Sequence, residues 1–159
     1  MASDAADFRA ALATFPSGIT LVTTRDADGK PWGFAATSFC SVSADPPLVL
    51  VCLATTAQCY PVFESAERWM IHVVHGEHSD LVDLFATRGA DKFGSGAFAD
   101  GPGGLPTLSD ASVVMECSRF EFTPAGDHSI LLGRVESAVV NEPHPVVYFQ
   151  RKIHPIGVN

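Results

Sequence analysis

Hydroxyl-bearing and small side chains are concentrated in the segment 35–43, which reads Ala-Ala-Thr-Ser-Phe-Cys-Ser-Val-Ser. Pro46, Pro47 and an apolar run follow it closely. Hydroxyls and accessible backbone amides with few charges suit a flat heterocycle with polar edges, such as a flavin, whose ring needs an apolar floor and hydrogen-bond donors. An ordinary Ser/Thr-rich strand face has the same composition, and the spacing alone favours this second interpretation.

Three histidines, His72, His75 and His78, are spaced three residues apart, which raises the hypothesis of a metal site. His72 falls in a strand-like pattern, and Gly76 interrupts the stretch. No cluster of Cys, Asp and Glu completes a tetrahedral ligand set. We therefore expect no metal and assign these histidines to the core or the surface.

The segment 94–99 matches the letters of the dinucleotide fingerprint Gly-x-Gly-x-x-Ala. That motif requires a strand before it and a helix after it, whereas here Asp91-Lys92 precedes and a Gly/Pro-rich stretch follows. A flexible loop is the favoured interpretation. The chain has no Gly-x-Ser-x-Gly, His-Glu-x-x-His or P-loop motif, so hydrolysis and phosphoryl transfer find no support.

The charge of the chain narrows the choice of partners. Its 159 residues include 10 Lys and Arg against 18 Asp and Glu, a formal net charge of −8. This field argues against nucleic acid and against an anionic membrane surface. The longest apolar run, 48–54, is far shorter than the roughly 20 residues of a membrane span, and the N-terminal Met-Ala-Ser-Asp lacks signal-peptide features. We expect a soluble, cytoplasmic protein.

The four cysteines also favour the cytoplasm. Cys40, Cys52, Cys59 and Cys117 include no Cys-x-x-Cys pair, and most lie in apolar or strand-like segments. Buried free thiols in a reducing compartment explain them better than disulfides do.

Hydrophobic periodicity predicts a first helix capped by Ser3 or Asp4, with Phe8, Leu12 and Phe15 on one face. The small residues from Gly33 onward indicate close approach to a strand backbone. The other expected elements are strands at 19–24, 32–42, 48–54, 68–74, 112–122, 129–140 and 146–149, short helices up to residue 63 and over 79–86, and a Gly/Pro loop over 94–106.

Many strands with few short helices, and no regular strand–helix alternation, predict a mainly β fold, an antiparallel barrel with peripheral helices. The strand at 48–54 is uniformly apolar and is expected to be buried on both faces. No linker or internal repeat interrupts the chain, so residues 1–159 are expected to form one domain.

An ordered set of motifs resembles the flavin reductase-like family of short NAD(P)H:flavin oxidoreductases. The motifs are Phe-Pro-Ser-Gly-Ile-Thr-Leu-Val-Thr-Thr at 15–24, the run from Gly33 to Cys52, Leu-Phe-Ala at 84–86, Asp-Lys-Phe at 91–93, Leu-Pro-Thr-Leu at 105–108, Met-Glu-Cys at 115–117, Gly-Asp-His at 126–128 and Gly-Arg-Val at 133–135. Together they cover nearly the whole chain in the family's order.

The resemblance implies a split, Greek-key-like, FMN-binding β-barrel that forms a homodimer and binds FMN or FAD near the subunit interface. NADH or NADPH would supply the hydride, and reduced flavin would diffuse to a partner monooxygenase. His128 would face the nicotinamide. The residues implied to hold the flavin are Thr37, Ser38, Ser41 and Val42 along the ring and ribityl chain, Cys52, Leu53 and Ala54 beside the ring, Thr55 and Thr56 towards the phosphate, and Lys92 and Phe93, which close the pocket.

Charge adds Arg88 to this set, because a flavin phosphate on an acidic protein needs local cations, and Arg88 with Lys92 forms the obvious cluster. The family often has Asn where this chain has His72, so His72 is expected to alter the flavin contacts. Ala35 and Cys40 replace hydroxyl residues of the family. A flavin-binding protein that retains its cofactor without turnover is the alternative hypothesis, and a metal-binding barrel that uses His72, His75 and His78 is a third.

Overall fold

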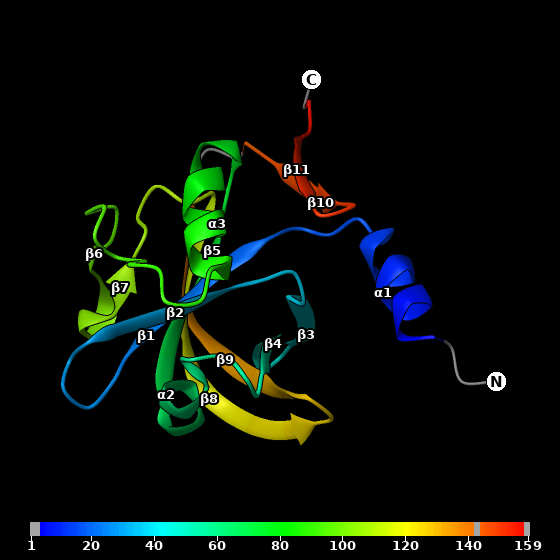
Figure 1. The fold of residues 1–159 in the computed structure, drawn as a ribbon. Helices are drawn as coiled ribbons and strands as arrows, with labels where there is room; N and C mark the ends of the chain where they lie inside the picture. Colours follow the sequence, from blue (N-terminus) through cyan, green and yellow to red (C-terminus); the bar gives the residue numbers. More distant parts are fainter. Residues whose placement is uncertain (1–3, 142–143, 158–159) are drawn as a thin grey trace.

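A seven-stranded antiparallel sheet with the strand order β2-β1-β5-β8-β9-β4-β3 forms the body of the protein (Figure 1). This computed structural model describes residues 4–141 and 144–157. Two-stranded ribbons, β6–β7 and β10–β11, lie outside the large sheet. The strands are β1 (Thr20–Arg25), β2 (Pro31–Ala36), β3 (Cys40–Ala44), β4 (Pro47–Ala54), β5 (Arg68–Val73), β6 (Ala99–Asp100), β7 (Pro106–Thr107), β8 (Val113–Ala125), β9 (His128–Val140), β10 (Val146–Phe149) and β11 (Lys152–Pro155).

The helices are short and peripheral: α1 (Ala5–Ala13), α2 (Tyr60–Ser65) and α3 (Ser79–Ala86), with 3₁₀ turns η1 (Gly76–His78) and η2 (Pro102–Gly104). The side chain of Asp4 caps α1 by accepting a hydrogen bond from the Ala6 N–H, whereas Ser3, the other expected cap, lies outside the described residues. None of the helices in the described ranges has the length and hydropathy that crossing a bilayer requires.

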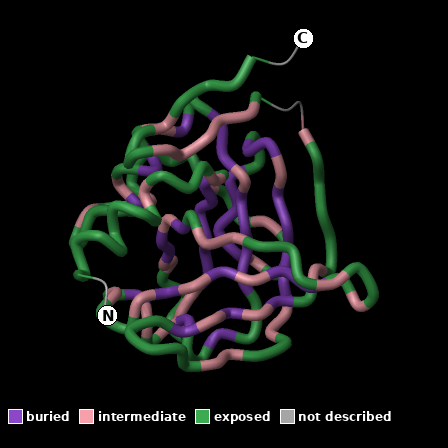
Figure 2. The backbone as a smooth tube through the Cα atoms, turned by 90° about the vertical axis from the view of Figure 1, so that its right-hand side faces the viewer, coloured by how far each residue is buried: buried purple, intermediate pink, exposed green. Residues whose placement is uncertain are grey.

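Side chains alternate between the two faces along each strand, and each face of the central part of the sheet contributes to an apolar cluster. On one face, Val22 and Ile71 pack in a cluster that includes Phe63 of α2. On the other face, Leu21 and Met70 pack in a second cluster with residues of α3. Figure 2 shows the buried segments in the middle of the molecule, with the exposed segments around them.

The sheet curls around the first of these clusters. Phe34 of β2 and Val51 of β4 belong to the same cluster, although their strands are far apart in the strand order. β2 and β3 remain at the two edges, and no ladder between them closes the sheet within residues 4–141 and 144–157. The expectation of a mainly β, antiparallel fold is confirmed, in the form of an open, curled sheet.

Some expected boundaries were wrong. The strand expected over 32–42 is divided into β2 and β3, because these strands occupy opposite edges of the sheet and residues 37–39 pass between them. Hydrophobic alternation does not reveal such a crossing. The connection expected at 123–128 is a two-residue turn of Gly126 and Asp127, with Gly126 at φ 65°. The strand β11 was missed.

Gly33 is the point at which α3 approaches β2 most closely. A Cβ atom at Gly33 would lie 2.5 Å from Phe85 Cε1 and 2.8 Å from the Val22 carbonyl oxygen. The expected close approach to this strand is therefore made by α3, and it requires glycine.

We predict that Gly33→Ala lowers the free energy of unfolding by about 1–3 kcal/mol, because the added methyl group overpacks this contact. Urea denaturation followed by circular dichroism measures the change. Gly18→Ala is the matched control, since a Cβ atom at Gly18 has nothing within 4 Å, and its effect should stay within about 0.5 kcal/mol. Equal stability of the two variants would contradict this account.

Candidate functional site

The strand β4 brings distant segments of the chain together. The end of its C-terminal half pairs with the start of β9, so that Ala54 lies opposite His128. On its other side, the N-terminal half of β4 pairs with β3, so that Ser41 lies opposite Val49. Residues expected to hold a flavin, which come from separate parts of the sequence, thus share one region of the sheet, which we call the β4 strip: 37–42, 52–55 and His128.

The segment before β3 is fastened to β4 by a hydroxyl. Ser38 Oγ accepts a hydrogen bond of 2.9 Å from the backbone N–H of Cys52. The register of β3 and β4 shifts between Ser41 and Ser43, and Val42 at this irregularity is 47% exposed. A bulge of this kind redirects side chains. Thr37 and Ser41 are also exposed, and all of these side chains are accessible to a ligand.

Side chains of β4 alternate between the core and the β4 strip. Val51 and Leu53 are 0% and 2% exposed and belong to the core cluster, whereas Cys52 and Ala54 are half-buried. The expectation that this strand is buried on both faces was therefore wrong, because one of its faces borders the strip. Leu53 presents only its backbone to a ligand on the strip.

His128 begins β9 immediately after the tight turn. Its Nδ1 lies 2.7 Å from Oδ1 of Asp127, and this contact lowers the pKa of the Asp127 carboxyl. The carbonyl oxygen of Asp127 accepts hydrogen bonds from both the backbone N–H and the hydroxyl of Thr55, at 2.9 and 3.1 Å. The imidazole is thereby oriented at the end of β4, and its side chain is 46% exposed.

Arg88 and Lys92, the cations expected to bind the flavin phosphate, lie in the segment that follows α3. Arg88 Nη1 donates a 2.8 Å hydrogen bond to the carbonyl of Thr56, and Lys92 Nζ donates one of 2.8 Å to the carbonyl of Thr87. The Gly89 N–H donates to Oε1 of Gln58 at 2.8 Å. The bonds of Arg88 and Gly89 hold the segment after α3 against the segment after β4, and the bond of Lys92 lies within the segment after α3.

A cavity of about 510 Å³ lies between these segments and β2. We call it the cationic cavity. Residues 30–34, 57–59 and 85–93 line it, including Arg88, Lys92 and Phe93. The ring of Phe93 packs 5.3 Å from that of Phe85, between centroids. Lys30 and Trp32 also line this cavity, and the sequence analysis did not predict them. The only indication in the sequence was a cation and an aromatic residue close together after the Asp-Gly turn.

A second cavity, of about 540 Å³, lies between the end of β2, α3 and the β10–β11 ribbon, and Thr37 lines it. Neither cavity is lined by the other residues of the β4 strip, which include Ser38, Ser41, Val42, Cys52, Ala54 and His128. The structure thus brings most of the expected residues into two adjoining parts, the β4 strip and the cationic cavity, joined by Thr55 and Thr56.

His72 lies apart from the strip. Its ring is 0% exposed; Nδ1–H donates to the carbonyl of Leu21 at 2.9 Å, and Nε2 accepts from the N–H of Leu108 at 3.1 Å. This pattern requires the neutral ring, and burial lowers the pKa of His72 to about 4. With both nitrogens occupied by the protein, His72 neither contacts a ligand on the strip nor coordinates a metal.

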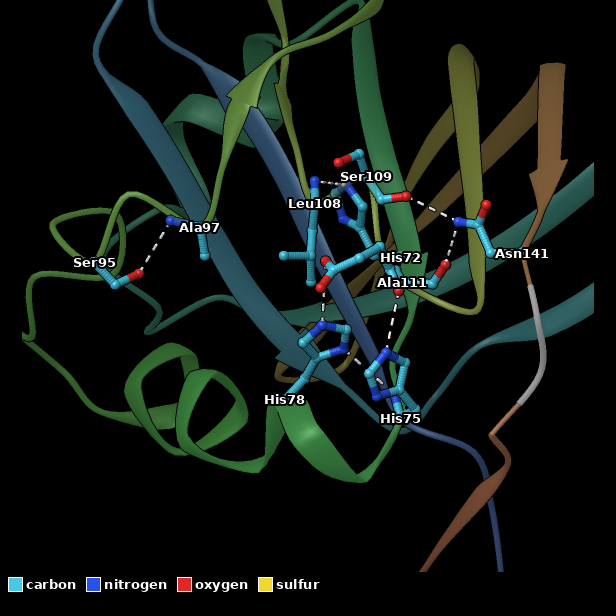
Figure 3. Close-up of polar contacts among 10 residues, drawn as sticks. His72, His75, His78, Ser95, Ala97, Leu108, Ser109, Ala111 and Asn141 are labelled. Atoms are coloured by element: carbon cyan, nitrogen blue, oxygen red, sulfur yellow. Dashed lines mark hydrogen bonds and ion pairs between the residues drawn. The ribbon is translucent and has the colours of Figure 1, made fainter.

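The three histidines instead fasten the segment 108–111 (Figure 3). His75 Nε2 donates to the carbonyl of Asp110 at 3.1 Å, and His78 Nε2 lies 3.3 Å from the carboxylate of the same residue. Asn141 donates to the carbonyls of residues 109 and 111, at 2.8 and 2.7 Å. Ligand atoms of His75, His78 and Asp110 lie within 4.8 Å of one another. His75 Nε2 is already a hydrogen-bond donor, whereas His75 Nδ1 and His78 Nε2 are buried without a hydrogen-bond partner among the described residues.

The four cysteines are free thiols. Cys59 and Cys117 are buried, and burial raises their thiol pKa values to about 11 and about 12. Cys52 is half-buried on the strip, and Cys40 is exposed on the edge strand β3, contrary to the expectation that these thiols are buried.

Residues 12–157 match the family model described as "Flavin reductase like domain". The chain is 47% identical over 153 residues to the actinorhodin polyketide dimerase of Streptomyces coelicolor, covering 96% of this chain and 86% of that protein. It is 37% identical to the NADH:riboflavin 5'-phosphate oxidoreductase of Streptomyces pristinaespiralis, covering 92% and 85%.

Solved structures agree in fold. The flavin reductase component BorF of a bacterial two-component tryptophan halogenase superposes with a TM-score of 0.89 at 27% identity, covering 98% of this chain and 100% of that one. The NADH:FAD oxidoreductase SgcE6 of Streptomyces globisporus, in complex with NAD and FAD fragments, gives 0.90 at 27% identity, covering 97% and 93%. The chain belongs to the flavin reductase-like family.

We predict that the stability of the protein falls as the pH is lowered from about 6.5 towards 4, in part because His72 protonates readily only after unfolding. The pKa of His72 is lowered to about 4 in the folded chain, so in this range the unfolded chain binds more protons. His72→Asn removes this proton uptake and one buried hydrogen bond. The variant should be less stable at pH 7, with a flatter stability profile between pH 6.5 and 4 in chemical denaturation. An unchanged slope would contradict this assignment.

Proposed function

We propose that the protein is an NAD(P)H-dependent flavin reductase, which transfers a hydride from NADH or NADPH to FMN or FAD and releases the reduced flavin to a partner monooxygenase. The observation that supports this most strongly is the convergence of 37–42, 52–55 and His128 on one strip beside a cavity lined by Arg88 and Lys92. Relatives whose names describe this activity include the reductase subunit HsaB of a flavin-dependent monooxygenase from Rhodococcus jostii, 33% identical over 150 residues.

The β4 strip fits the flat ring of a flavin. Ser38 supplies a hydroxyl and Val42 supplies apolar surface, while the side chains of Cys52 and Ala54 are small enough for a ring to approach the backbone. Ser41, on the edge strand β3 opposite Val49, would contact the ligand from the edge of the strip. A bound flavin supplies the acceptor atom for the hydride, so no protein nucleophile is required. The contribution of the chain is to hold two rings in contact and to exclude water between them.

The phosphate of the flavin would lie in the cationic cavity, near Arg88 and Lys92. Both side chains donate to backbone carbonyls, and neither pairs with a carboxylate in the ranges 4–141 and 144–157. A phosphate therefore adds charge-assisted hydrogen bonds without breaking an ion pair. Thr55, which donates to the carbonyl of Asp127, and Thr56, which accepts from Arg88, connect the proposed ring and phosphate positions. Phe93 lines the cavity.

His128 would orient the nicotinamide. Asp127 contacts the imidazole through Nδ1, and Nε2 of this 46% exposed side chain has no hydrogen-bond partner among the described residues. From a position opposite Ala54, Nε2 can hydrogen-bond the carboxamide of a nicotinamide that stacks on the flavin.

The cytoplasm, where nicotinamide cofactors are available and the four free thiols stay reduced, is the proposed location, and residues 1–159 are proposed to be one domain. The alternative of a cofactor-retaining binding protein rested on His72 and Ala35. Because His72 is enclosed in the core, it no longer supports the alternative of a retained cofactor.

The decisive experiment mixes purified protein with FMN, FAD or riboflavin and follows the nicotinamide absorbance of NADH and of NADPH. Consumption that requires both protein and flavin, followed by recovery of colourless protein on desalting, supports the proposal. Yellow protein that survives desalting and does not turn over added flavin would establish the retained-cofactor alternative instead. No consumption with any pair would refute the reductase assignment.

We predict that His128→Ala slows hydride transfer about tenfold or more, while the Kd for oxidised flavin changes less than twofold, because the imidazole acts on the nicotinamide side. Stopped-flow reduction of bound flavin measures the first quantity, and fluorescence titration measures the second. His154→Ala, which changes an exposed histidine of β11, is the control and should alter neither. An equal loss of flavin affinity in His128→Ala would show that the residue binds flavin instead.

We further propose that the chain forms a homodimer. The apolar stripe of α1 is exposed: Phe8 and Leu12 are 57% and 58% accessible, and no residue of α1 is buried. Phe15, expected on the same helical face, lies beyond the end of α1 at Ala13 and is 72% accessible. Figure 1 shows α1 beside the sheet rather than packed on it. An amphipathic helix without a core partner in its own chain is best explained by a second copy that covers it.

We predict that Phe8→Asp with Leu12→Asp converts the dimer into a monomer, because charges on this stripe oppose its burial. Size-exclusion chromatography with light scattering measures the mass. Arg9→Asp, on the same helix, is the control and should remain dimeric. A monomeric wild-type chain at micromolar concentration would refute the dimer.

A further inference from the structure

The cationic cavity has room for more than a single phosphate. Its volume of about 510 Å³ lies within the roughly 300–1,000 Å³ of pockets that enclose whole small molecules. Arg88 and Lys92 come from the segment after α3, whereas Lys30 and Trp32 come from the start of β2. The cavity therefore continues from the expected phosphate position to the β1–β2 turn.

Its charge also exceeds the need of one phosphate. Lys30, Arg88 and Lys92 line the cavity, against one carboxylate, Asp91. They are three of only 10 Lys and Arg residues in a chain of net charge −8. Across the described ranges none of the three forms an ion pair with a carboxylate. Cations gathered in this way match a ligand with two phosphate groups.

Trp32 gives the same cavity an immobilised aromatic ring. Its Nε1–H donates a 2.9 Å hydrogen bond to Oδ2 of Asp26, and Lys30 Nζ lies 4.4 Å from the ring centroid. Trp32 is half-buried, whereas Trp69 is fully buried in the core. An accessible indole is a stacking surface for a nucleobase. The flexible side chain of Lys30 allows its ammonium group to move from the indole to a phosphate.

We propose that the cationic cavity binds an adenosine diphosphate group, with the pyrophosphate between Lys30 and the pair Arg88 and Lys92, and with the adenine against Trp32. FAD and the nicotinamide dinucleotides share this group, and FMN lacks it. The proposal rests on the function proposed above and extends it, because Lys30 and Trp32 then favour FAD over FMN, or hold the adenosine end of the hydride donor.

The test begins with ADP alone, titrated into the full-length protein while tryptophan fluorescence is followed. Because Trp69 is buried, a saturable change should arise from Trp32 and should disappear in Trp32→Phe. Lys30→Ala should raise the Kd for ADP about tenfold, as expected for a lost charge-assisted contact. Arg134→Ala, which removes an exposed cation of β9 that lines neither cavity, is the matched control and should leave the Kd unchanged.

Two further measurements identify the source of the adenosine diphosphate. If FAD supplies it, Lys30→Ala raises the Kd for FAD about tenfold and leaves that for FMN unchanged, whereas Lys92→Ala weakens both flavins. If the nicotinamide dinucleotide supplies it, Lys30→Ala raises the KM for NADH, measured with riboflavin as acceptor, and leaves both flavin Kd values unchanged. Either result supports the site.

The proposal is overturned if ADP causes no saturable change and Lys30→Ala alters neither the flavin Kd values nor the KM for NADH. In that case continued flavin reduction by the same preparation leaves the reductase assignment intact. Conversely, ADP binding that depends on Lys30 in a protein without flavin reduction would support the nucleotide site and refute the reductase.

Discussion

The register between β4 and β9 is the constraint on which the rest of the site depends. Because side chains alternate along a strand, the register that buries Val51 and Leu53 also places Ala54 opposite His128. A shift by one residue would exchange the buried and exposed sets of β4. The hydrophobic requirement of the core thus fixes the position of a polar side chain on the other face, and the tight turn at Gly126 completes the placement.

Fold class and several elements could be predicted from local pattern alone. The helix over 79–86 has the predicted limits, since its apolar residues follow the helical period and all pack on one side. The break between β2 and β3 could not be predicted, because it depends on which edges of the sheet these strands occupy. The exposed stripe of α1 is a similar case: its periodicity is helical, but the single chain provides no core surface for it.

The residues of the candidate site could be proposed from the sequence where they belong to continuous motifs. They could not be proposed where only the packing of distant segments brings them together. Ser38, Thr55 and His128 could be proposed because their motifs are continuous in sequence, and the structure brings them to one strip. His72 was assigned to the same site from its motif position, yet its carbonyl and amide partners belong to Leu21 and Leu108, far along the chain. Trp32 was missed for the corresponding reason, since only the fold places it beside Lys92.

The unpaired cations of the cationic cavity sit in a chain of net charge −8, and these two features act over different distances. Repulsion of an approaching dinucleotide by the net charge acts through the solvent, where mobile ions screen it beyond the Debye length of about 8 Å at physiological ionic strength. Attraction by Lys30, Arg88 and Lys92 acts at contact, where mobile ions screen little. Added salt therefore raises the association rate constant of anionic ligands more than it raises their dissociation rate constant. In a basic protein that binds nucleotides, added salt instead lowers the association rate constant.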